Sequence, residues 1–471
     1  MSPSQKKETL TLVLALLVTG GLLGGGYLIY QAFTSGSDLE NKEDRESTER
    51  IENKTRENKI QLSQGETPLF PESTSESKQA GIDAFSNQNY PLAVEQFEAA
   101  LREKKNDPET RIYLNNARIG NQKSHQIAVV TPVSDIPNIA SELLRGVAQA
   151  QTEINQAGGI NGIALKVLIA DDANNPEIAE NVAETLSNNS EILGVIGHYS
   201  SGVSLAASPV YQQNQLVMIS PTSTSTKLSN AGDFIFRTVP SDGFAANTLT
   251  RYFLENLSSS KAAIFYNEES AYSRSLKDEV TREIYGDGGE VVETFDLSSE
   301  DFDPFTSYDT LTAQQADAII LVPSSDTLSK ALQITRVNEQ DLPILAGDDV
   351  YNPDTLKVGE DVVGMVVAIP WHIENNRFSD FVQTADDLWG ADVNWRTAMA
   401  YDATQTFAAA IAVSPSRSGV AESLSGSGLS VEGATGAIRF LPSGDRNQAF
   451  ELVTIQPGTR TSFGYDFVPL Q

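Results

Sequence analysis

From about Ser124 onward, short runs of apolar, often β-branched residues alternate with stretches in which apolar residues recur at helical spacing. This alternation is typical of parallel strands joined by helices. The predicted strands, too many for one doubly wound sheet, are Ile127–Thr131, Leu165–Ala170, Leu193–Gly197, Leu216–Ile219, Ala262–Tyr266, Ala318–Val322, Pro343–Ala346 and Gly364–Ile369. The pattern therefore predicts two doubly wound, Rossmann-like α/β lobes, with a ligand crevice at the carboxyl ends of both sets of strands.

The segment 78–122 has a purely helical pattern, with apolar residues three and four positions apart. It resembles a tetratricopeptide unit at Gly81, Asn89-Tyr90, Ala93, Phe97 and Ala100, where small residues allow two helices to pack closely. Only one such unit is visible, and these repeats need about three neighbours to bury a core. We therefore expect a small α-helical hairpin, either a partner-binding element or, as we favour, a spacer or self-association surface.

A continuous uncharged stretch, Leu10–Phe33, follows Lys6 and Lys7. A helix needs roughly 20 apolar residues to cross a bilayer, whereas a signal-peptide core has about 7–15. We expect an uncleaved transmembrane anchor, although the small residues 34–37 also permit cleavage. Because the two lysines favour a cytoplasmic N-terminus, the chain after residue 33 is expected outside the cytoplasm, in the periplasm or extracellular space.

The stretch between this anchor and the helical segment is mixed in charge and then rich in Ser, Thr, Glu and Pro. Its few apolar residues do not offset the entropy of ordering, so it predicts a flexible stalk. The expected organisation is thus a cytoplasmic N-terminus 1–9, anchor 10–33, stalk 34–77, helical unit 78–122 and two-lobed domain 125–471. Lobe 1 is expected over about 125–242 and 371–430, and lobe 2 over about 243–370 and 431–471.

The amino-acid composition excludes several classes of function. The chain has 471 residues, 33 basic and 63 acidic, for a formal net charge of −30, which repels nucleic-acid phosphates. It contains no cysteine, which excludes disulfides, thiolate metal sites and a lipid-modified N-terminal cysteine. The three histidines, His125, His198 and His372, lack metal-ligand spacing, so no metal or cofactor and no Ser-His-Asp catalysis is expected.

Four motifs of the α/β region carry a family resemblance. They are Ile154–Gly162 (INQAGGING), Asp171–Pro176 (DDANNP), Gly194–Gly202 (GVIGHYSSG) and Ile219–Thr224 (ISPTST). In order and spacing they resemble the Leu/Ile/Val-binding proteins of ABC importers, the type I periplasmic solute-binding family, over nearly all of 127–471. The resemblance implies two lobes that close on a ligand about a hinge, with no enzymatic step.

The third motif has a physical interpretation of its own. Ser200 and Ser201 leave a predicted strand and enter a helix, whose free N–H groups favour a carboxylate. A plain serine N-cap explains them equally well. In the second motif, Asp171 and Asp172 precede Pro176, which indicates turn chemistry more than a metal-binding pair.

The resemblance assigns the remaining site residues. It implies that the hydroxyl and amide of Ser201 bind the ligand's carboxylate. It also implies that the main-chain carbonyl of Thr222 and the hydroxyl and amide of Thr224 contact the ligand's amino and carboxylate groups. From lobe 2 it implies Tyr272, which packs on the ligand, and Asp349, which pairs with an ammonium. The predicted site consists of these residues and Ser200, with Asp348 as an alternative to Asp349. Trp371 is either a wall of the side-chain pocket or, equally well, a buried aromatic residue at the junction of the lobes.

Three functions are compatible with these patterns. We favour a binding protein that captures an amino acid or similar small zwitterion or amide and presents it to ABC permease subunits. The alternative is a ligand-sensing receptor ectodomain in a signalling assembly, which the fixed anchor and helical hairpin would suit. A hydrolase is disfavoured, because the segment 197–202 does not match the G-x-S-x-G nucleophile pattern.

Overall fold

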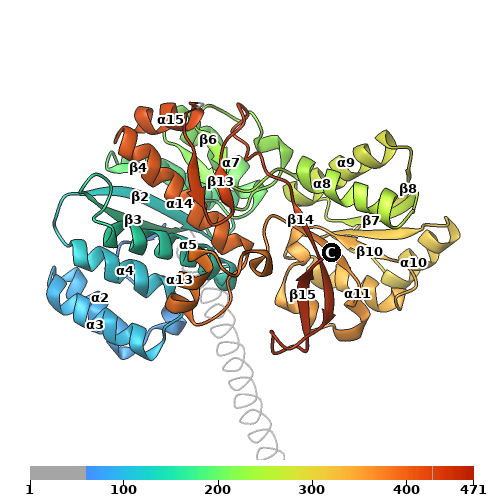
Figure 1. Ribbon diagram of the computed structural model, residues 1–471, viewed down its shortest axis with the longest axis horizontal. Coiled ribbons are helices and arrows are strands. Elements are labelled where there is room, and N and C mark those ends of the chain that lie inside the picture. The colour runs from blue at the N-terminus through green and yellow to red at the C-terminus, as the bar shows by residue number, and fades with distance from the viewer. Residues whose placement is uncertain (1–59, 427, 471) are drawn as a thin grey trace, which may run out of the picture. The chain divides into compact units, whose positions relative to one another are not determined.

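The computed structural model describes residues 60–426 and 428–470. The expected N-terminus 1–9, the anchor 10–33 and the first part of the stalk, 34–59, lie outside the described residues. Within the part of the chain that the structure describes, no helix is both long and apolar enough to cross a membrane. Two α/β lobes, each around its own sheet, make up most of this part (Figure 1).

Lobe 1 is built on a sheet whose described strands run in the order β1-β3-β2-β4-β5-β6. These strands are β1 (Gln61–Ser63), β2 (Ser124–Thr131), β3 (Ala164–Asp171), β4 (Ile192–Ile196), β5 (Met218–Ser220) and β6 (Ile235–Arg237). All neighbours pair in parallel except β1 with β3. The helices of this lobe are α5 (Pro137–Gln156), α6 (Pro176–Asn188), α7 (Ser201–Gln213), α13 (Asp380–Trp389), α14 (Trp395–Val413) and α15 (Arg417–Ser425).

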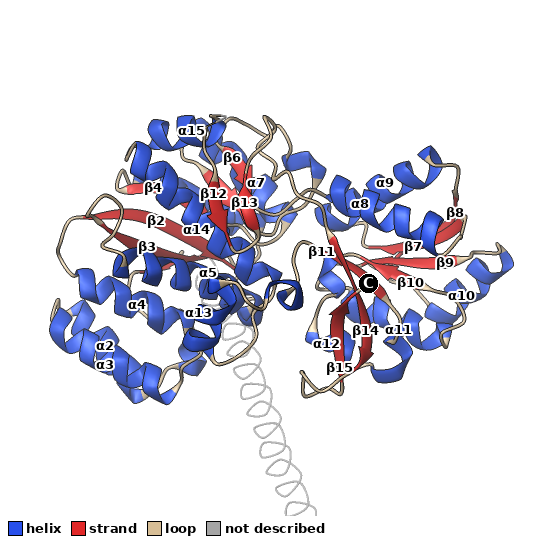
Figure 2. Cartoon of the chain, viewed as in Figure 1, coloured by secondary structure: helices blue, strands red, loops and turns tan. Residues whose placement is uncertain are grey.

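Lobe 2 has a mixed sheet in the order β15-β14-β11-β10-β9-β7-β8 (Figure 2). Its strands are β7 (Lys261–Tyr266), β8 (Glu290–Asp296), β9 (Ala318–Val322), β10 (Ile344–Ala346), β11 (Val366–Ile369), β14 (Glu451–Pro457) and β15 (Tyr465–Pro469). Its α-helices are α8 (Asp242–Arg251), α9 (Ala271–Gly286), α10 (Pro304–Ala313), α11 (Leu328–Asn338) and α12 (Pro353–Leu356). The eight predicted strands are all present, as β2–β5, β7 and β9–β11.

Short helical turns complete the elements. They are the 3-10 helices η1 (Pro71–Ser73), η2 (Thr226–Leu228), η4 (Asp348–Val350), η5 (Gly359–Val362) and η6 (Ile373–Asn376), and the π-helical turn η3 (Tyr252–Asn256). The turn η4 directly follows the buried strand β10. It therefore places two aspartates at the carboxyl end of the lobe 2 sheet.

The chain passes between the lobes after β6, after β11 and before β14. The last crossing lies further along the chain than the sequence predicts. The hairpin of β12 (Val431–Gly433) and β13 (Gly436–Ile438) packs on α14 of lobe 1, and Arg237 binds Asp445 with Nε and Oδ1 2.7 Å apart. Residues 431–446 thus belong with lobe 1, not with lobe 2, because buried charge pairing and the hairpin hold them there.

The end of the predicted stalk is also part of lobe 1. Within residues 60–77, β1 pairs with the edge of β3, and Leu69 is buried against Glu109, whose Oε1 accepts from the Leu69 N–H at 2.6 Å. Three residues of main-chain pairing and one buried leucine order a segment that composition alone marks as polar. The stalk prediction is therefore wrong for residues 60–77.

The helical unit comprises α2 (Glu76–Ser86), α3 (Tyr90–Glu103) and α4 (Pro108–Ile119). At Gly81 a Cβ atom would lie 2.5 Å from the ring of Phe97, so the close α2–α3 packing expected from small residues is observed. The unit does not stand apart as a spacer, because α4 packs on α5 and β3, and Asn116 donates to the Val167 carbonyl at 2.7 Å. A buried salt bridge joins Lys78 to Glu109, with Nζ and Oε2 2.6 Å apart.

Candidate functional site

A cavity of about 530 Å³ lies between the lobes. It is lined by Asp135, Ile136, Asn174, Pro176, Tyr199, Ser200, Ser201, Gly202, Val203, Thr222, Asn267, Glu269, Ser270, Ala271, Tyr272, Ser324, Ser325, Asp326, Asp348, Asp349 and Trp395. Nearly all of these residues follow the carboxyl ends of parallel strands: β2, β3, β4 and β5 in lobe 1, and β7, β9 and β10 in lobe 2. This edge is where open α/β sheets bind ligands, and the volume suits a small molecule.

The lobe 1 wall begins where β4 turns into α7. Gly197 has a φ of +139°, and a Cβ atom there would overlap the Val130 carbonyl, so the turn requires glycine. Ser200 is the N-cap of α7, yet its side chain makes no capping hydrogen bond. Its hydroxyl and the first N–H groups of α7 therefore remain available to a ligand, which removes the simple N-cap explanation for this serine.

The loop after β5 also belongs to the lobe 1 wall, and it contacts the turn between β4 and α7. Thr222 lines the cavity, and its hydroxyl donates to the Tyr199 carbonyl at 2.8 Å. Ser201 Oγ accepts from the Ser225 N–H at 3.2 Å. Thr224 is only 1% exposed and does not line the cavity; its carbonyl accepts from the Asp242 N–H at 2.8 Å. Thr224, a predicted site residue, thus lies behind the residues that line the cavity.

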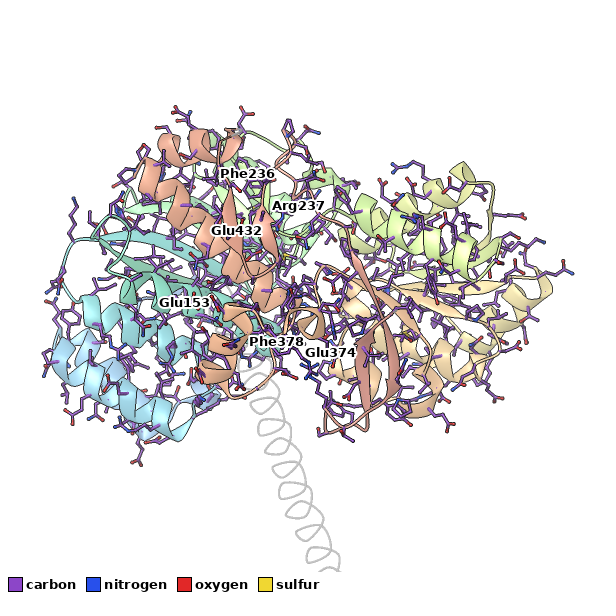
Figure 3. All side chains as sticks on the ribbon, viewed as in Figure 1. Glu153, Phe236, Arg237, Glu374, Phe378 and Glu432 are labelled. Carbon is purple, nitrogen blue, oxygen red and sulfur yellow. The ribbon has the colours of Figure 1, made fainter. Side chains whose placement is uncertain are left out.

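Arg237, labelled in Figure 3, holds this second loop from behind. Its guanidinium donates to the carbonyls of Ser223 at 3.1 Å and Ser225 at 2.8 Å, and it is almost fully buried. Its charged partner is Asp445, on the segment that next crosses to lobe 2. The cavity loop and a crossing segment therefore share one buried cation, a link that no sequence motif indicated.

The lobe 2 wall contains the aspartate pair. Asp348 is 3% exposed, and Tyr272 donates to its Oδ1 at 2.8 Å. Gly347 makes this contact sterically feasible, because a Cβ atom there would overlap the Tyr272 hydroxyl. Burial, with the neighbouring charge of Asp349, raises the pKa of Asp348 to about 7. A cationic ligand group would favour the ionised form of this carboxyl.

Asp349 has protein partners on both lobes. Its carboxylate lies 3.5 Å from Arg396 Nη2, 3.3 Å from the Tyr199 hydroxyl and 3.4 Å from Ser325 Oγ. Burial raises the pKa of Asp349, while the Arg396 charge opposes that rise. Tyr199 and Ser325 also hydrogen-bond each other across the cavity at 2.8 Å. These contacts join the two lobes directly.

Arg396 and Trp395 were not predicted from the sequence. They begin α14 of lobe 1; Trp395 lines the cavity, and the Arg396 guanidinium lies 4.5 Å from the Trp395 ring centre. Arg396 also lies 3.5 Å from Glu142 on α5, so it is shared between two carboxylates. Asn394, which caps α14 through its side chain, is a local helix signal but says nothing of where the helix points.

The structure brings five of the seven predicted site residues to the cavity: Ser200, Ser201, Thr222, Tyr272 and Asp349. Trp371 does not line it. That side chain is 2% exposed and packs edge-on against Phe381, with ring centres 5.9 Å apart. Trp371 is thus a core residue at the junction of the lobes, and Trp395 takes the place expected of it.

His198 is fully buried behind the α7 turn. Its Nδ1 lies 2.7 Å from Asp172 Oδ2, and its Nε2 lies 3.1 Å from the Tyr211 hydroxyl. The side chains of Asp171 and Asp172 also accept from the N–H groups of Ala173 and Asn174, both at 2.9 Å, which is the expected turn chemistry. The histidine therefore faces a tyrosine in the core and not a serine in the cavity, so the arrangement is not a catalytic triad.

Comparisons with known proteins agree with this architecture. A family model described as periplasmic binding protein matches residues 124–460. Leu/Ile/Val-binding protein homolog 1 of Brucella abortus is 25% identical over 232 residues, which are 48% of this chain and 61% of that protein. The matched part therefore spans less than two thirds of that relative's length.

Solved structures are similar over the same region. An ABC transporter substrate-binding protein from Desulfitobacterium hafniense is 26% identical, with a TM-score of 0.63, and the match covers 74% of this chain and 100% of that one. A substrate-binding protein from that organism in complex with Leu is 24% identical, with a TM-score of 0.62 and coverages of 74% and 100%. The second likeness concerns the fold alone.

Proposed function

The chain belongs to the periplasmic binding protein family, and we propose that it is the solute-binding component of an ABC transporter. It binds an amino acid or a similar small zwitterion or amide by lobe closure, and it does no chemistry on it. One observation carries this proposal: the cavity has a helix N-terminus with the uncapped hydroxyl of Ser200 on one wall, and the buried Asp348 beside the half-buried Asp349 on the other. These are complementary partners for a carboxylate and an ammonium.

Within this site, Asp348 rather than Asp349 receives the ligand's ammonium. Asp349 already has Arg396, Tyr199 and Ser325 as partners, whereas Asp348 is bonded only by Tyr272, through Oδ1. Among the described residues, no donor reaches Asp348 Oδ2. Since a buried carboxylate without a full set of partners is costly, a ligand cation is the group that best completes it.

The proposal also covers where the binding domain is located and how it is anchored. The family's periplasmic character and the apolar segment 10–33 both favour an extracytoplasmic domain anchored by a single span in the cell membrane. Since β1 at the start of the described chain is a strand of lobe 1, such an anchor would hold lobe 1 and leave lobe 2 free to close. The tetratricopeptide-like unit, packed on lobe 1, is then part of the fixed half.

Calorimetry on the detergent-solubilised full-length chain, against the proteinogenic amino acids, short amides and urea, tests binding. Binding of at least one of them with one-to-one stoichiometry is expected, and no heat from any of them would refute the proposal. Affinity purification tests the transport role. Recovery of permease subunits is expected, whereas recovery of a histidine kinase in their place would favour the receptor ectodomain.

A further inference from the structure

The residues that line the cavity have an unbalanced charge. Among the described residues that line it, five are carboxylates and none is a lysine or an arginine. The acidic ones are Asp135 on lobe 1 and Glu269, Asp326, Asp348 and Asp349 on lobe 2. A neutral amino acid brings one cation and one anion into this cavity. Binding a neutral amino acid therefore leaves the excess negative charge of the cavity unchanged.

Two of the five carboxylates lie deep, and one cation serves them. Arg396 lies 3.5 Å from Asp349, but it is equally close to Glu142. Its single charge is thus divided between two carboxylates, and Asp348 is left with a neutral donor, Tyr272. The deep part of the cavity accommodates one ligand ammonium and does not use the charge of the other three carboxylates.

Those other three carboxylates lie at the rim. Asp135, Glu269 and Asp326 are exposed, and none of them forms a salt bridge with another described residue. Asp326 is held in place by the Asn267 amide, with Nδ2 and Oδ2 3.3 Å apart. Carboxylates on both walls of the opening add their potentials, and the low-dielectric walls concentrate the field there.

We propose that the ligand is an amino acid whose side chain ends in a second cation, an amine or a guanidine. The α-ammonium lies at Asp348, the carboxylate at the start of α7, and the distal cation at the rim between Asp135, Glu269 and Asp326. This inference rests on the proposed function and deepens it by naming the ligand class. The cavity volume of about 530 Å³ has room for such a side chain.

Matched ligand pairs test the inference, because they change the distal charge and little else. L-Arginine and L-citrulline have nearly the same shape, and L-norleucine is L-lysine without its terminal ammonium group. In calorimetry with the full-length chain, the cationic member of each pair is expected to bind about tenfold more tightly, the sum of a few partly exposed ion pairs. This preference should shrink as sodium chloride is added, since the rim charges are open to screening.

A double variant, Glu269→Gln with Asp326→Asn, locates the effect. It removes two rim charges while keeping the shapes of both side chains, and it is expected to reduce the arginine-over-citrulline preference to about twofold. Glu268→Gln is the matched control, because this glutamate is an exposed neighbour on the same loop that does not line the cavity. The control should keep the full preference.

The outcomes separate this inference from the proposed function. If citrulline or norleucine binds as tightly as its cationic partner, the inference is overturned and amino acid binding stands. If no amino acid binds, the proposed function fails with it. A preference for arginine that survives both the double variant and high salt would also overturn the rim assignment, and tighter binding of agmatine than of arginine would overturn the role of α7.

Discussion

The two walls of the cavity differ in chemistry and in how they are built. Lobe 1 presents hydroxyls and main-chain N–H groups at the start of α7, with Asp135 as its only lining carboxylate. Lobe 2 presents Tyr272 and four carboxylates, among them Asp348 and Asp349. One wall suits an anion and the other suits a cation, so a zwitterion has one favoured orientation.

Under the proposed function, this difference links lobe closure to ligand recognition. Neither wall alone completes a zwitterion's hydrogen bonds. Two direct contacts between the lobes involve residues that line this cavity: Tyr199 with Ser325, and Asp349 with Arg396. A ligand that joins the walls adds to contacts that already exist. Affinity therefore reports on both walls, and single substitutions can show which wall holds which group.

The largest effect is expected on the cationic side, from Asp348→Asn. This change removes the charge that faces the ligand's ammonium, and loss of one partner of a buried charge pair costs about 2–5 kcal/mol, a factor of about 30 to several thousand in affinity. Calorimetry with the amino acid that binds best measures it. Asp354→Asn, an exposed neighbour outside the cavity, is the control and should bind normally.

The same variant has a second readout that excludes misfolding. Because burial raises the pKa of Asp348 from 3.8 to about 7, ionisation of this carboxyl destabilises the unliganded fold, at a cost that grows from about pH 4 and is complete above about pH 7. The Asn variant should therefore melt at or above the wild-type temperature at about pH 8. A variant that melts higher but keeps wild-type affinity would place the ammonium elsewhere.

On the anionic side, Ser201→Ala tests the hydroxyl at the start of α7. A hydrogen bond to a charged group contributes about 1.5–3 kcal/mol, so a tenfold or greater loss of affinity is expected. Ser208→Ala on the same helix is the control, since that serine donates to the Leu205 carbonyl and does not line the cavity. Equal effects of the two substitutions would argue against a ligand anchor at Ser201.

The pH dependence of binding tests the cationic wall without a mutation. An ammonium binds the ionised form of Asp348, whose pKa of about 7 in the unliganded protein reflects burial and the charge of Asp349. Affinity should rise about five- to tenfold from about pH 6 to about pH 8 and then level off. Asp348→Asn should flatten this profile, and an unchanged slope in the variant would assign it to another group.

The smallest effect is expected from Tyr199→Phe, which removes the hydroxyl that bridges the walls. The variant loses the 2.8 Å contact with Ser325 and the 3.3 Å contact with Asp349. A net cost of about 0.5–1.5 kcal/mol predicts a two- to tenfold weaker affinity, with a larger radius of gyration in solution scattering before ligand is added. Tyr308→Phe, on the surface of lobe 2, should change neither quantity.

The pattern of apolar residues predicts much of the fold, and the strands that it does not predict have physical explanations. The predicted strands are buried and most are followed by α-helices, so the strand pattern and the helix pattern support each other. By contrast, β8 is a half-exposed edge strand, and β14 and β15 form an antiparallel hairpin without an intervening helix. The strand β1 is ordered by its neighbour β3 and not by its own three residues, which include one buried side chain.

For the site, the sequence locates loops better than it locates side chains. Polar residues after strands identify both walls, because parallel strands end at one edge. It does not tell which of two adjacent aspartates faces the cavity or which tryptophan lines it. Trp371 and Trp395 are both buried aromatic residues, and Arg396 gains its role only because α14 brings it to Asp349 and Glu142. Such roles depend on packing between distant segments.

The most direct measurement is a thermodynamic cycle with the best-binding amino acid and its analogue lacking the α-amino group. Both are titrated into the wild type and into Asp348→Asn by calorimetry. The account predicts that the wild type prefers the amino acid by about a hundredfold and that the variant nearly loses this preference. An equal preference in both proteins would contradict the assignment of the cationic wall to Asp348.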